Sequence, residues 1–360
     1  MSAPGVYLLL IRLRRGLPVT LGRRTVALAP GWYVYCGSAL GGLAGRLARH
    51  LRTSQVRHWH VDALLAAGQV ADVQVCLTTD PAAECRLAAT VAAWTGAEPV
   101  PGFGCTDCRC ATHLFRFAGR PGGALLAPAV LAQIDNIMSA LRQYAPSPEW
   151  ARRDAFQTLV ACILSLRTQD PVTDAAAARL FAEFATPAAL AAAAPATVAR
   201  LIYPVGMYHT KARNLVALSR QLLERFGGRT PAEIDDLLTL PNVGRKTANL
   251  VRSFAYGLDA ICVDTHVHRI GNRWGLVRTA TPDDTERELR NVLPQRYWIE
   301  LNHLLVRHGQ LVCRPARPKC AGCFLRPWCQ YAALCAAQAV IAAIPGAPAH
   351  PAAPPGRSVP

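Results

Sequence analysis

Residues 240–264 read LPNVGRKTANLVRSFAYGLDAICVD, and this stretch decides how the second half of the chain folds. It opens with a tight turn over residues 241–244, where the backbone must pass through positive φ. Gly244 adopts that conformation without steric cost, and Asn242 is the next most tolerant residue. Helix formers without proline follow over residues 245–256. Because backbone N–H groups at a helix start face outward and bind phosphate, the sequence predicts a phosphate-holding turn and helix.

Two residues with reactive side chains lie at the beginning of this predicted helix and beyond its end. Lys246 stands in its first turn, and Asp264 follows the helix and a short strand-like run over residues 260–263. Of the 39 Lys and Arg residues, three are Lys, so the chain uses Arg wherever a positive charge suffices. Since Lys, unlike Arg, can be tuned to a neutral amine, Lys246 is interpreted as a nucleophile, with a phosphate-binding lysine as the alternative. The helix start and Arg245 are expected to lower its pKa. Asp264 is interpreted as its partner carboxylate, with a helix cap before Thr265 as the alternative, and the two roles can coexist.

Length and composition limit the classes of protein that fit. The 360 residues allow two domains and a tail. A net charge of +16 indicates a polyanionic partner. No apolar run reaches membrane-span length, and the charges of the N-terminal MSAPGVYLLLIRLRR follow its apolar stretch, so we expect neither a membrane protein nor a signal peptide. Thirteen Cys then indicate metal or cluster ligands in a reducing cytoplasm rather than disulfides.

The pattern of elements predicts two domains of different class. Residues 1–120 are expected to form a small α+β domain, because strand-like and helix-like runs alternate. Its strands are predicted at 6–13, 25–28, 32–36, 70–78 and 113–117, and its helices at 44–51 and 82–94. A linker is expected over 121–128, an all-α domain over 129–335, and a disordered Ala- and Pro-rich tail over 336–360. Helices are predicted at 129–144, 154–167, 172–184 and 211–226, and Thr281 with Pro282 marks the start of another.

The N-terminal motifs carry a resemblance of their own. Gly5-Val6-Tyr7, then Tyr35-Cys36-Gly37, resemble the GIY-YIG nuclease pattern, and a small GIY-YIG-like family of unknown role is also similar in carrying HWH (58–60) and FGCxDCxC (103–110). In such nucleases Tyr and Arg activate water and steady the phosphate, while a helix Glu holds a metal ion. The resemblance implies those roles, with Mg²⁺ as the ion, for Tyr7, Tyr35, Arg46, His50 and Glu84. Cys36 departs from the usual triplet, so a DNA-holding module without cleavage is favoured over a nuclease. A third interpretation is that the tyrosines only pack the strands.

A group of soft ligands lies in the same domain. Cys105, Cys108, Cys110 and His113 fall within nine residues and could close around Zn²⁺. The C-x-C spacing places neighbouring thiolates awkwardly, so a reduced cysteine cluster without metal is the alternative.

Four ordered motifs connect the helical half to a known family. LSLRTQD (164–170), IYPVGMYHTKA (202–212), LPNVGRKTAN (240–249) and VDTHVHR (263–269) occur in that order. Over residues 131–334 the chain resembles the endonuclease III family of helix-hairpin-helix DNA glycosylases. The resemblance implies an all-α, monomeric, nucleoid-associated enzyme that acts on lesions or abasic sites in double-stranded DNA.

The cysteines near the C-terminus complete this resemblance. Cys313, Cys320, Cys323 and Cys329 have the family's iron–sulfur spacing, which implies a [4Fe–4S] cluster in a loop over residues 313–329. A Zn(Cys)₄ site is the rival, although zinc sites usually pair two C-x2-C knuckles and here there is one. Between the first two cysteines, Arg314, Arg317 and Lys319 form a basic loop suited to a phosphate.

The family's chemistry implies a role for each motif. A damaged base must be flipped out of the duplex, and Met207 and Arg167 are the candidates to fill the gap. Asn242, Gly244 and Arg245 would hold the DNA backbone. The implied activity is that of a bifunctional DNA glycosylase and DNA-(apurinic or apyrimidinic site) lyase of base-excision repair, acting on oxidised pyrimidines. Arg167 replaces the family's usual Gln, so a mismatch- or uracil-type glycosylase stays open, as does a DNA-binding scaffold with a vestigial site.

Overall fold

The computed structural model describes residues 4–21, 24–51, 59–105, 107–121, 130, 133–145, 154–332 and 335. The chain divides into two compact units. The first contains residues 1–140, 269–279 and 310–360, and the second contains residues 141–268 and 280–309. The predicted linker beyond residue 121, the predicted tail and His58 lie outside the described residues.

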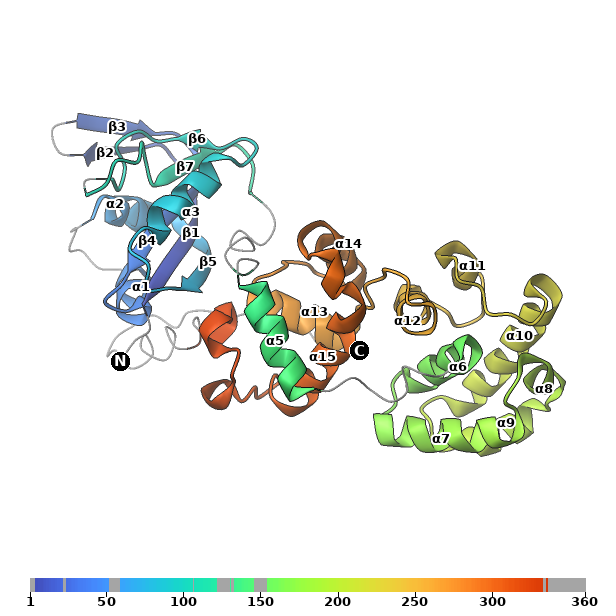
Figure 1. Ribbon diagram of the computed structural model, residues 1–360. Helices are drawn as coiled ribbons and strands as arrows, with labels where there is room; N and C mark the ends of the chain where they lie inside the picture. Colours follow the sequence, from blue (N-terminus) through green and yellow to red (C-terminus); the bar gives the residue numbers. More distant parts are fainter. Residues whose placement is uncertain are drawn as a thin grey trace. The chain divides into compact units, whose positions relative to one another are not determined.

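The N-terminal part of the first unit is built on a five-stranded antiparallel sheet with strand order β5-β1-β4-β7-β6 (Figure 1). A separate hairpin, β2 with β3, accompanies it. The strands are β1 (Gly5–Leu13), β2 (Leu17–Leu21), β3 (Arg24–Leu28), β4 (Gly31–Ala39), β5 (Gln69–Leu77), β6 (Glu98–Pro99) and β7 (Leu114–Phe117). Pro18 in β2 and the brevity of β6 explain why the sequence pattern missed these two strands.

Helices cover both faces of this sheet. Successive residues of β1 point to opposite faces, as the pleat requires. On one face Leu9 and Ile11 share a core with Leu47 of α1 (Leu43–Leu51) and Leu64 of α2 (His60–Ala67). On the other face the core includes Leu8 and Leu10 of the strand with Leu87 and Val91 of α3 (Ala83–Ala92). The prediction of an α+β region is confirmed, although α2 was not anticipated.

From residue 133 onward the described chain is helical. Its α-helices are α5 (Ile134–Tyr144), α6 (Ala155–Ser165), α7 (Asp170–Glu183), α8 (Pro187–Ala192), α9 (Pro195–Ile202), α10 (Tyr208–Phe226), α11 (Ile234–Leu238), α12 (Arg245–Tyr256), α13 (Thr265–Trp274), α14 (Pro282–Val292) and α15 (Trp298–Leu311). Short 3-10 turns follow at η2 (Gln295–Tyr297), η3 (Cys320–Gly322) and η4 (Arg326–Trp328). Side-chain caps set several starts: Asp154 accepts from Gln157 N at 2.7 Å, and Thr281 accepts from Asp284 N at 3.1 Å, as its sequence predicts.

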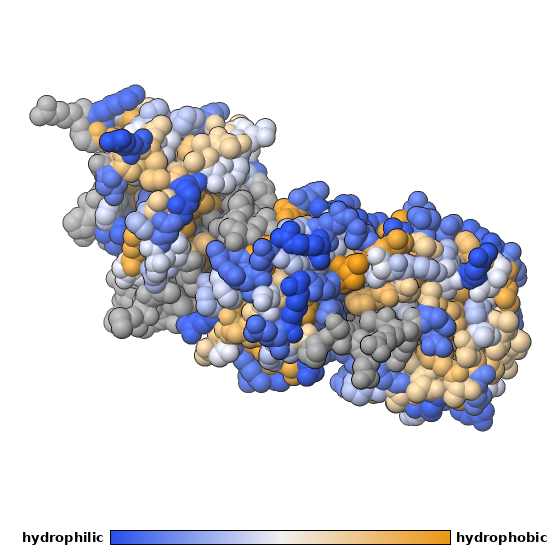
Figure 2. Space-filling view, viewed as in Figure 1, coloured by the Kyte–Doolittle hydropathy of each residue, from blue (hydrophilic) through white to orange (hydrophobic). Residues whose placement is uncertain are grey.

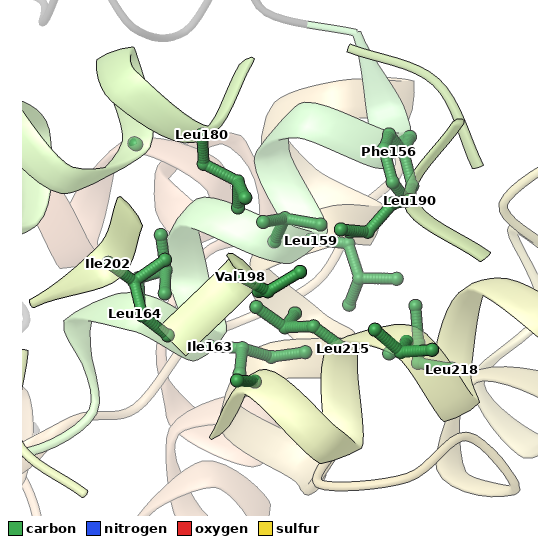
Figure 3. Packing of buried hydrophobic residues seen from close by; sticks show 14 of the residues in the cluster. Phe156, Leu159, Ile163, Leu164, Leu180, Leu190, Val198, Ile202, Leu215 and Leu218 are labelled. Atoms are coloured by element: carbon green, nitrogen blue, oxygen red, sulfur yellow. The ribbon is translucent and has the colours of Figure 1, made fainter. Parts of the chain in front are cut away.

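The core of the second unit lies among α6 to α12. Apolar residues at helical spacing, such as Leu159 and Ile163 of α6 and Leu215 and Leu218 of α10, interlock in it (Figure 3). Val243 and Val251 extend the same core into the hairpin and α12, so the predicted phosphate-holding turn is anchored to the core of the unit.

One predicted strand is wrong. Residues 260–263 form a buried segment without strand structure, since none of the described residues of this unit forms a strand that could pair with it. Its backbone is satisfied differently: Asn302 Nδ2 donates to Cys262 O at 3.2 Å.

No helix of the described residues is long and apolar enough to cross a membrane. On the face shown in Figure 2, hydrophilic and apolar residues are interspersed.

Candidate active site and metal centres

The turn between α11 and α12 differs from its prediction at the level of single residues. Asn242, with φ of 64°, takes the left-handed conformation, whereas Gly244, with φ of −102°, is the extended N-cap of α12. Gly244 serves in another way, because a Cβ added to it would meet no heavy atom within 4 Å. The start of α12 is therefore open, with its first N–H groups accessible to an anion.

Lys246 lies half-buried in the first turn of α12, among sulfur atoms. Its Nζ donates to Cys162 Sγ of α6 at 3.4 Å, and Cys262 Sγ donates to Lys246 O at 3.5 Å. Sequence reasoning missed both cysteines, since neither belongs to a metal-ligand spacing. The two thiols and Leu250 form a small buried cluster that walls the lysine.

The pKa of Lys246 moves opposite to the expectation. Burial lowers this pKa, but Cys162, Cys262 and Asp264 raise it, and the net direction is upward. Arg245 does not oppose this, because its guanidinium pairs with Glu286 at 2.6 Å. The raised pKa therefore favours the ammonium form of Lys246 in the free protein.

Asp264 caps the helix that follows it and also lies close to Lys246. Its Oδ1 accepts from the backbone N–H of His266 and of Val267, both at 2.9 Å, which caps α13. The same carboxylate is near enough to raise the pKa of Lys246. Capping and catalysis therefore do not exclude each other.

Two exposed loops present the predicted gap-filling residues. Arg167 follows α6 with φ of 55°, and Met207, 61% exposed, precedes α10 with φ of 58°. With Asn242 they are the non-glycine residues of positive φ in the described chain, and such strain is typical of functional positions. The loops are in contact: Gly206 N donates to Thr168 Oγ1 at 3.1 Å, and a Cβ on Gly206 would lie 2.7 Å from Arg167 O.

Lys211, which the sequence did not mark, fixes one of these loops. It is 4% exposed, and its Nζ donates to Leu164 O at 2.9 Å and also to Leu166 O. These carbonyls belong to the C-terminal end of α6, so the buried amine closes the turn that leads to Arg167. Burial lowers the pKa of Lys211 to about 8.

The four C-terminal cysteines converge in the first unit. Burial raises the pKa of Cys329 to about 12, and the nearby Cys313, Cys323 and Cys320 add to this rise. Arg273 stands beside them, and its Nη1 donates to Cys313 Sγ at 3.3 Å and to Arg314 O at 2.8 Å. Arg314, Arg317 and Lys319 are exposed on the intervening loop.

The nuclease-like residues of the N-terminal sheet also come together. Tyr7 Oη lies 2.8 Å from His50 Nε2, and the ring centroids of Tyr7 and Tyr35 are 6.3 Å apart. Burial raises the pKa of Tyr7 well above its usual value, which Glu84 raises further and Arg46 lowers. Burial also lowers the pKa of His50 to about 4. Tyr7, Tyr35 and His50 are therefore assembled and buried, whereas Arg46 and Glu84 are partly exposed.

Glu84 and the cysteines depart from their predicted roles. Glu84 Oε1 lies 2.9 Å from His113 Nδ1, and Oε2 accepts from Ser38 Oγ, so both oxygens are engaged within the protein. Cys105 does not join the soft-ligand group, because its Sγ faces Ala111 O at 3.8 Å. The group that forms instead takes one member from α3: Cys85, Cys108, Cys110 and His113.

Comparisons with known proteins match the two halves of the chain to different families. Residues 6–128 match a domain of unknown function, DUF123, and residues 160–295 match the HhH-GPD superfamily base excision DNA repair protein family. The chain is 44% identical over 178 residues to endonuclease III of Thermotoga maritima, covering 49% of this chain and 84% of the relative. It is 34% identical over 198 residues to that of Escherichia coli, covering 54% and 94%. It spans 48% of the chloroplastic endonuclease III homolog 1 of Arabidopsis thaliana, at 40% identity over 48% of this chain.

Solved structures agree with these relatives. A trapped endonuclease III–DNA covalent intermediate is similar at 32% identity with a TM-score of 0.52, covering 56% of this chain and 96% of that one. A thermostable thymine-DNA glycosylase shares the fold, at 23% identity and a TM-score of 0.53 over 57% of this chain and 97% of that one.

Proposed function

The chain belongs to the endonuclease III family, as a base-excision repair DNA glycosylase and abasic-site lyase, and from that premise we propose that Lys246 is its nucleophile and Asp264 its partner carboxylate. The observation that carries the proposal is the position of Lys246. It is a half-buried amine in the first turn of α12, beside a helix start left open by Gly244 and within electrostatic reach of Asp264.

In the proposed reaction the amine of Lys246 first displaces the base and then, as a Schiff base, allows the strand to be cut. Once Lys246 has given up its proton, its Nζ attacks C1′ of the flipped nucleotide, the C1′–N bond breaks and the base leaves with a proton. Ring opening then gives a Schiff base between Nζ and C1′. Loss of a C2′ proton expels the 3′ phosphate, which nicks the strand. The negative charge of Asp264 stabilises the cation that develops at C1′ and offers a site for the proton of Lys246.

The hairpin would hold the DNA backbone, and the two loops with positive φ would insert side chains into the duplex. The open start of α12 carries Asn242, Gly244 and Arg245. A phosphate of the DNA backbone can accept hydrogen bonds from the backbone N–H groups there. Met207 and Arg167 would occupy the space that the flipped base leaves, because they are exposed and anchored by the contact through Gly206.

Oxidised pyrimidines are the proposed substrates, with a mismatch- or uracil-type activity as the alternative. Arg167 favours guanine edges, where the family's usual Gln does not, so we expect a preference for guanine opposite the lesion. The test is a panel of duplexes with an oxidised pyrimidine, uracil, thymine opposite guanine, or an abasic site. Base release from the oxidised pyrimidine is expected, and Arg167→Gln should relax the opposite-base preference. Release restricted to uracil or mismatched thymine would favour the alternative.

Substitution of Asp264 separates its two roles. Asp264→Asn keeps an oxygen for the cap of α13 but removes the charge, so base release should slow on the order of 10²-fold with thermal stability unchanged. Equal activity of the variant and the wild type would leave capping as the function of Asp264.

Cys313, Cys320, Cys323 and Cys329 are proposed to hold a [4Fe–4S] cluster. Four thiols of one loop fit it by donor chemistry, and Arg273 beside Cys313 Sγ would stabilise the negative thiolates. When bound, the cluster would have a structural role. It would hold the basic loop that carries Arg314, Arg317 and Lys319 in its folded form. Purified protein should contain about four iron and four sulfide per chain. Zinc without sulfide at these cysteines would contradict the assignment.

For the N-terminal domain we propose a DNA-holding module on a GIY-YIG-like scaffold, rather than a nuclease. The reason is that His113 and Ser38 engage both oxygens of Glu84, which a metal-dependent nuclease would need for its ion. The test uses the full chain with Lys246→Gln, which silences the lyase, on branched and nicked DNA with Mg²⁺ or Mn²⁺. No cleavage is expected; cleavage that disappears on adding Glu84→Gln or Arg46→Ala would establish the nuclease instead.

A further inference from the structure

We infer that Cys85, Cys108, Cys110 and His113 bind one Zn²⁺, with Glu84 as the carboxylate that orients His113. This site is independent of the glycosylase chemistry. It joins residues that are distant in sequence, because Cys85 belongs to α3, Cys108 and Cys110 to the loop before β7, and His113 directly precedes that strand.

The spacing of the ligand atoms suits one tetrahedral ion. The three sulfurs and one imidazole nitrogen all lie within 4.8 Å of one another. With Zn–S bonds of about 2.3 Å, neighbouring sulfurs of a tetrahedral site lie roughly 3.8 Å apart, so small side-chain rotations close the group. Three thiolates also exclude Mg²⁺ and Ca²⁺, which prefer oxygen ligands.

His113 is already held as a zinc ligand requires. It is 1% exposed, and its Nδ1 faces Glu84 Oε1 at 2.9 Å, so the Nδ1–H donates to the carboxylate. Nε2 is left as the acceptor nitrogen, and it faces Cys108 Sγ at 3.5 Å. A carboxylate behind a histidine that faces a metal fixes both the tautomer and the ring direction.

The backbone around the ligands is fixed from two sides. His113 N donates to Phe103 O at 2.7 Å, and Cys36 N donates to His113 O at 2.9 Å, which ties the histidine to its own loop and to β4. The loop over 107–112 has no helix or strand of its own. A zinc ion would therefore cross-link this loop to α3, and Cys85 is the residue that makes the link.

The first experiment compares two cysteines in the full chain, purified without oxygen, with iron and zinc measured together. Wild-type protein with a full complement of iron should hold about one zinc per chain. Cys85→Ser should lose that zinc and keep its iron, whereas Cys105→Ser, the matched control, should keep both metals. Absence of zinc from zinc-supplemented wild type, or loss of zinc in Cys105→Ser but not in Cys85→Ser, would overturn the assignment.

Cobalt gives a second readout should Cys85→Ser fail to fold. Wild-type protein reconstituted with Co²⁺ should show thiolate charge-transfer bands and the intense visible bands of tetrahedral coordination. Weak octahedral bands alone would refute a tetrahedral thiolate site.

Chelator competition tests the part assigned to Glu84. Glu84→Ala should weaken zinc binding 10- to 100-fold, roughly the loss seen when such a carboxylate is removed. Glu84→Gln, which keeps an acceptor oxygen for the Nδ1–H, should recover part of the affinity. Equal zinc affinity in Glu84→Ala and the wild type would refute this role.

Discussion

At the scale of single residues, the environment of Lys246 sets the conditions for its chemistry. The amine donates to the Cys162 thiol and is close to Cys262 and Asp264, and these neighbours raise its pKa more than burial lowers it. In the proposed reaction, attack at C1′ needs the neutral amine, so the site would have to take a proton away when DNA is bound. Burial also raises the pKa of the Cys262 thiol, which lies against the backbone carbonyl of Lys246.

The rate of Schiff-base formation should therefore rise with pH. Because the raised pKa of Lys246 keeps it protonated at neutral pH, each pH unit should add about a tenfold larger fraction of neutral amine. Cys162→Ala removes a group that raises this pKa and should shift the single-turnover profile toward lower pH. Cys76→Ala, a half-buried cysteine of β5, serves as control and should leave the profile in place. A profile flat from pH 6 to 9 in the wild type would contradict a titrating lysine.

At the scale of elements, two glycines have different roles: one allows close packing between loops, and the other leaves a helix start accessible to DNA. Gly206 lets two loops touch, and Gly244 leaves the start of α12 open. Gly206→Ala should lower stability and lesion excision together, because its Cβ would lie 2.7 Å from Arg167 O. Gly244→Ser adds a favourable N-cap residue in open space, so stability should hold or rise while DNA binding weakens. Thermal melts and binding titrations of both variants test this; unchanged DNA affinity in Gly244→Ser would argue against a phosphate at this helix start.

Sequence patterns predicted most elements and fewer of the contacts between them. Thr281 with Pro282 identified a helix start because cap and first turn are local in sequence. The hairpin was recognised, but not which residue would take positive φ, since that depends on how Val243 enters the core. Cys85 and Cys162 reach their partners only through tertiary packing, so no spacing marked them. Lys211 is one of three lysines in an arginine-rich chain, and this rarity was the sequence signal that could have marked it. Its burial became visible only in the structure.

At the scale of the whole molecule, positive charge is shared by both halves of the chain. Residues 1–120 hold 13 Arg against six Asp and Glu, a net +7 of the total +16. A DNA-holding N-terminal domain beside a glycosylase would raise the local concentration of DNA at the second site, without a second reaction.

Binding to DNA should weaken steeply with salt, since each neutralised phosphate releases counterions. If about five phosphates are contacted, the slope of log K against log salt should be roughly −4 to −5. Arg317→Gln, on the exposed basic loop, should reduce the slope by about one unit, whereas Arg49→Gln should not, because Arg49 pairs with Asp62 at 2.9 Å. A slope near zero would show that the charge is not directed at nucleic acid.

The most direct test of the central claim is borohydride trapping on an abasic duplex, because borohydride reduces a Schiff base to a stable covalent link. Wild-type protein and Lys319→Gln, which removes an exposed lysine, should both be trapped, and the modified peptide should contain Lys246. Lys246→Gln should bind the duplex, since the hairpin backbone is intact, yet give no covalent product. Trapping that persists in Lys246→Gln, or a modified peptide without Lys246, would contradict the assignment of this lysine as the nucleophile.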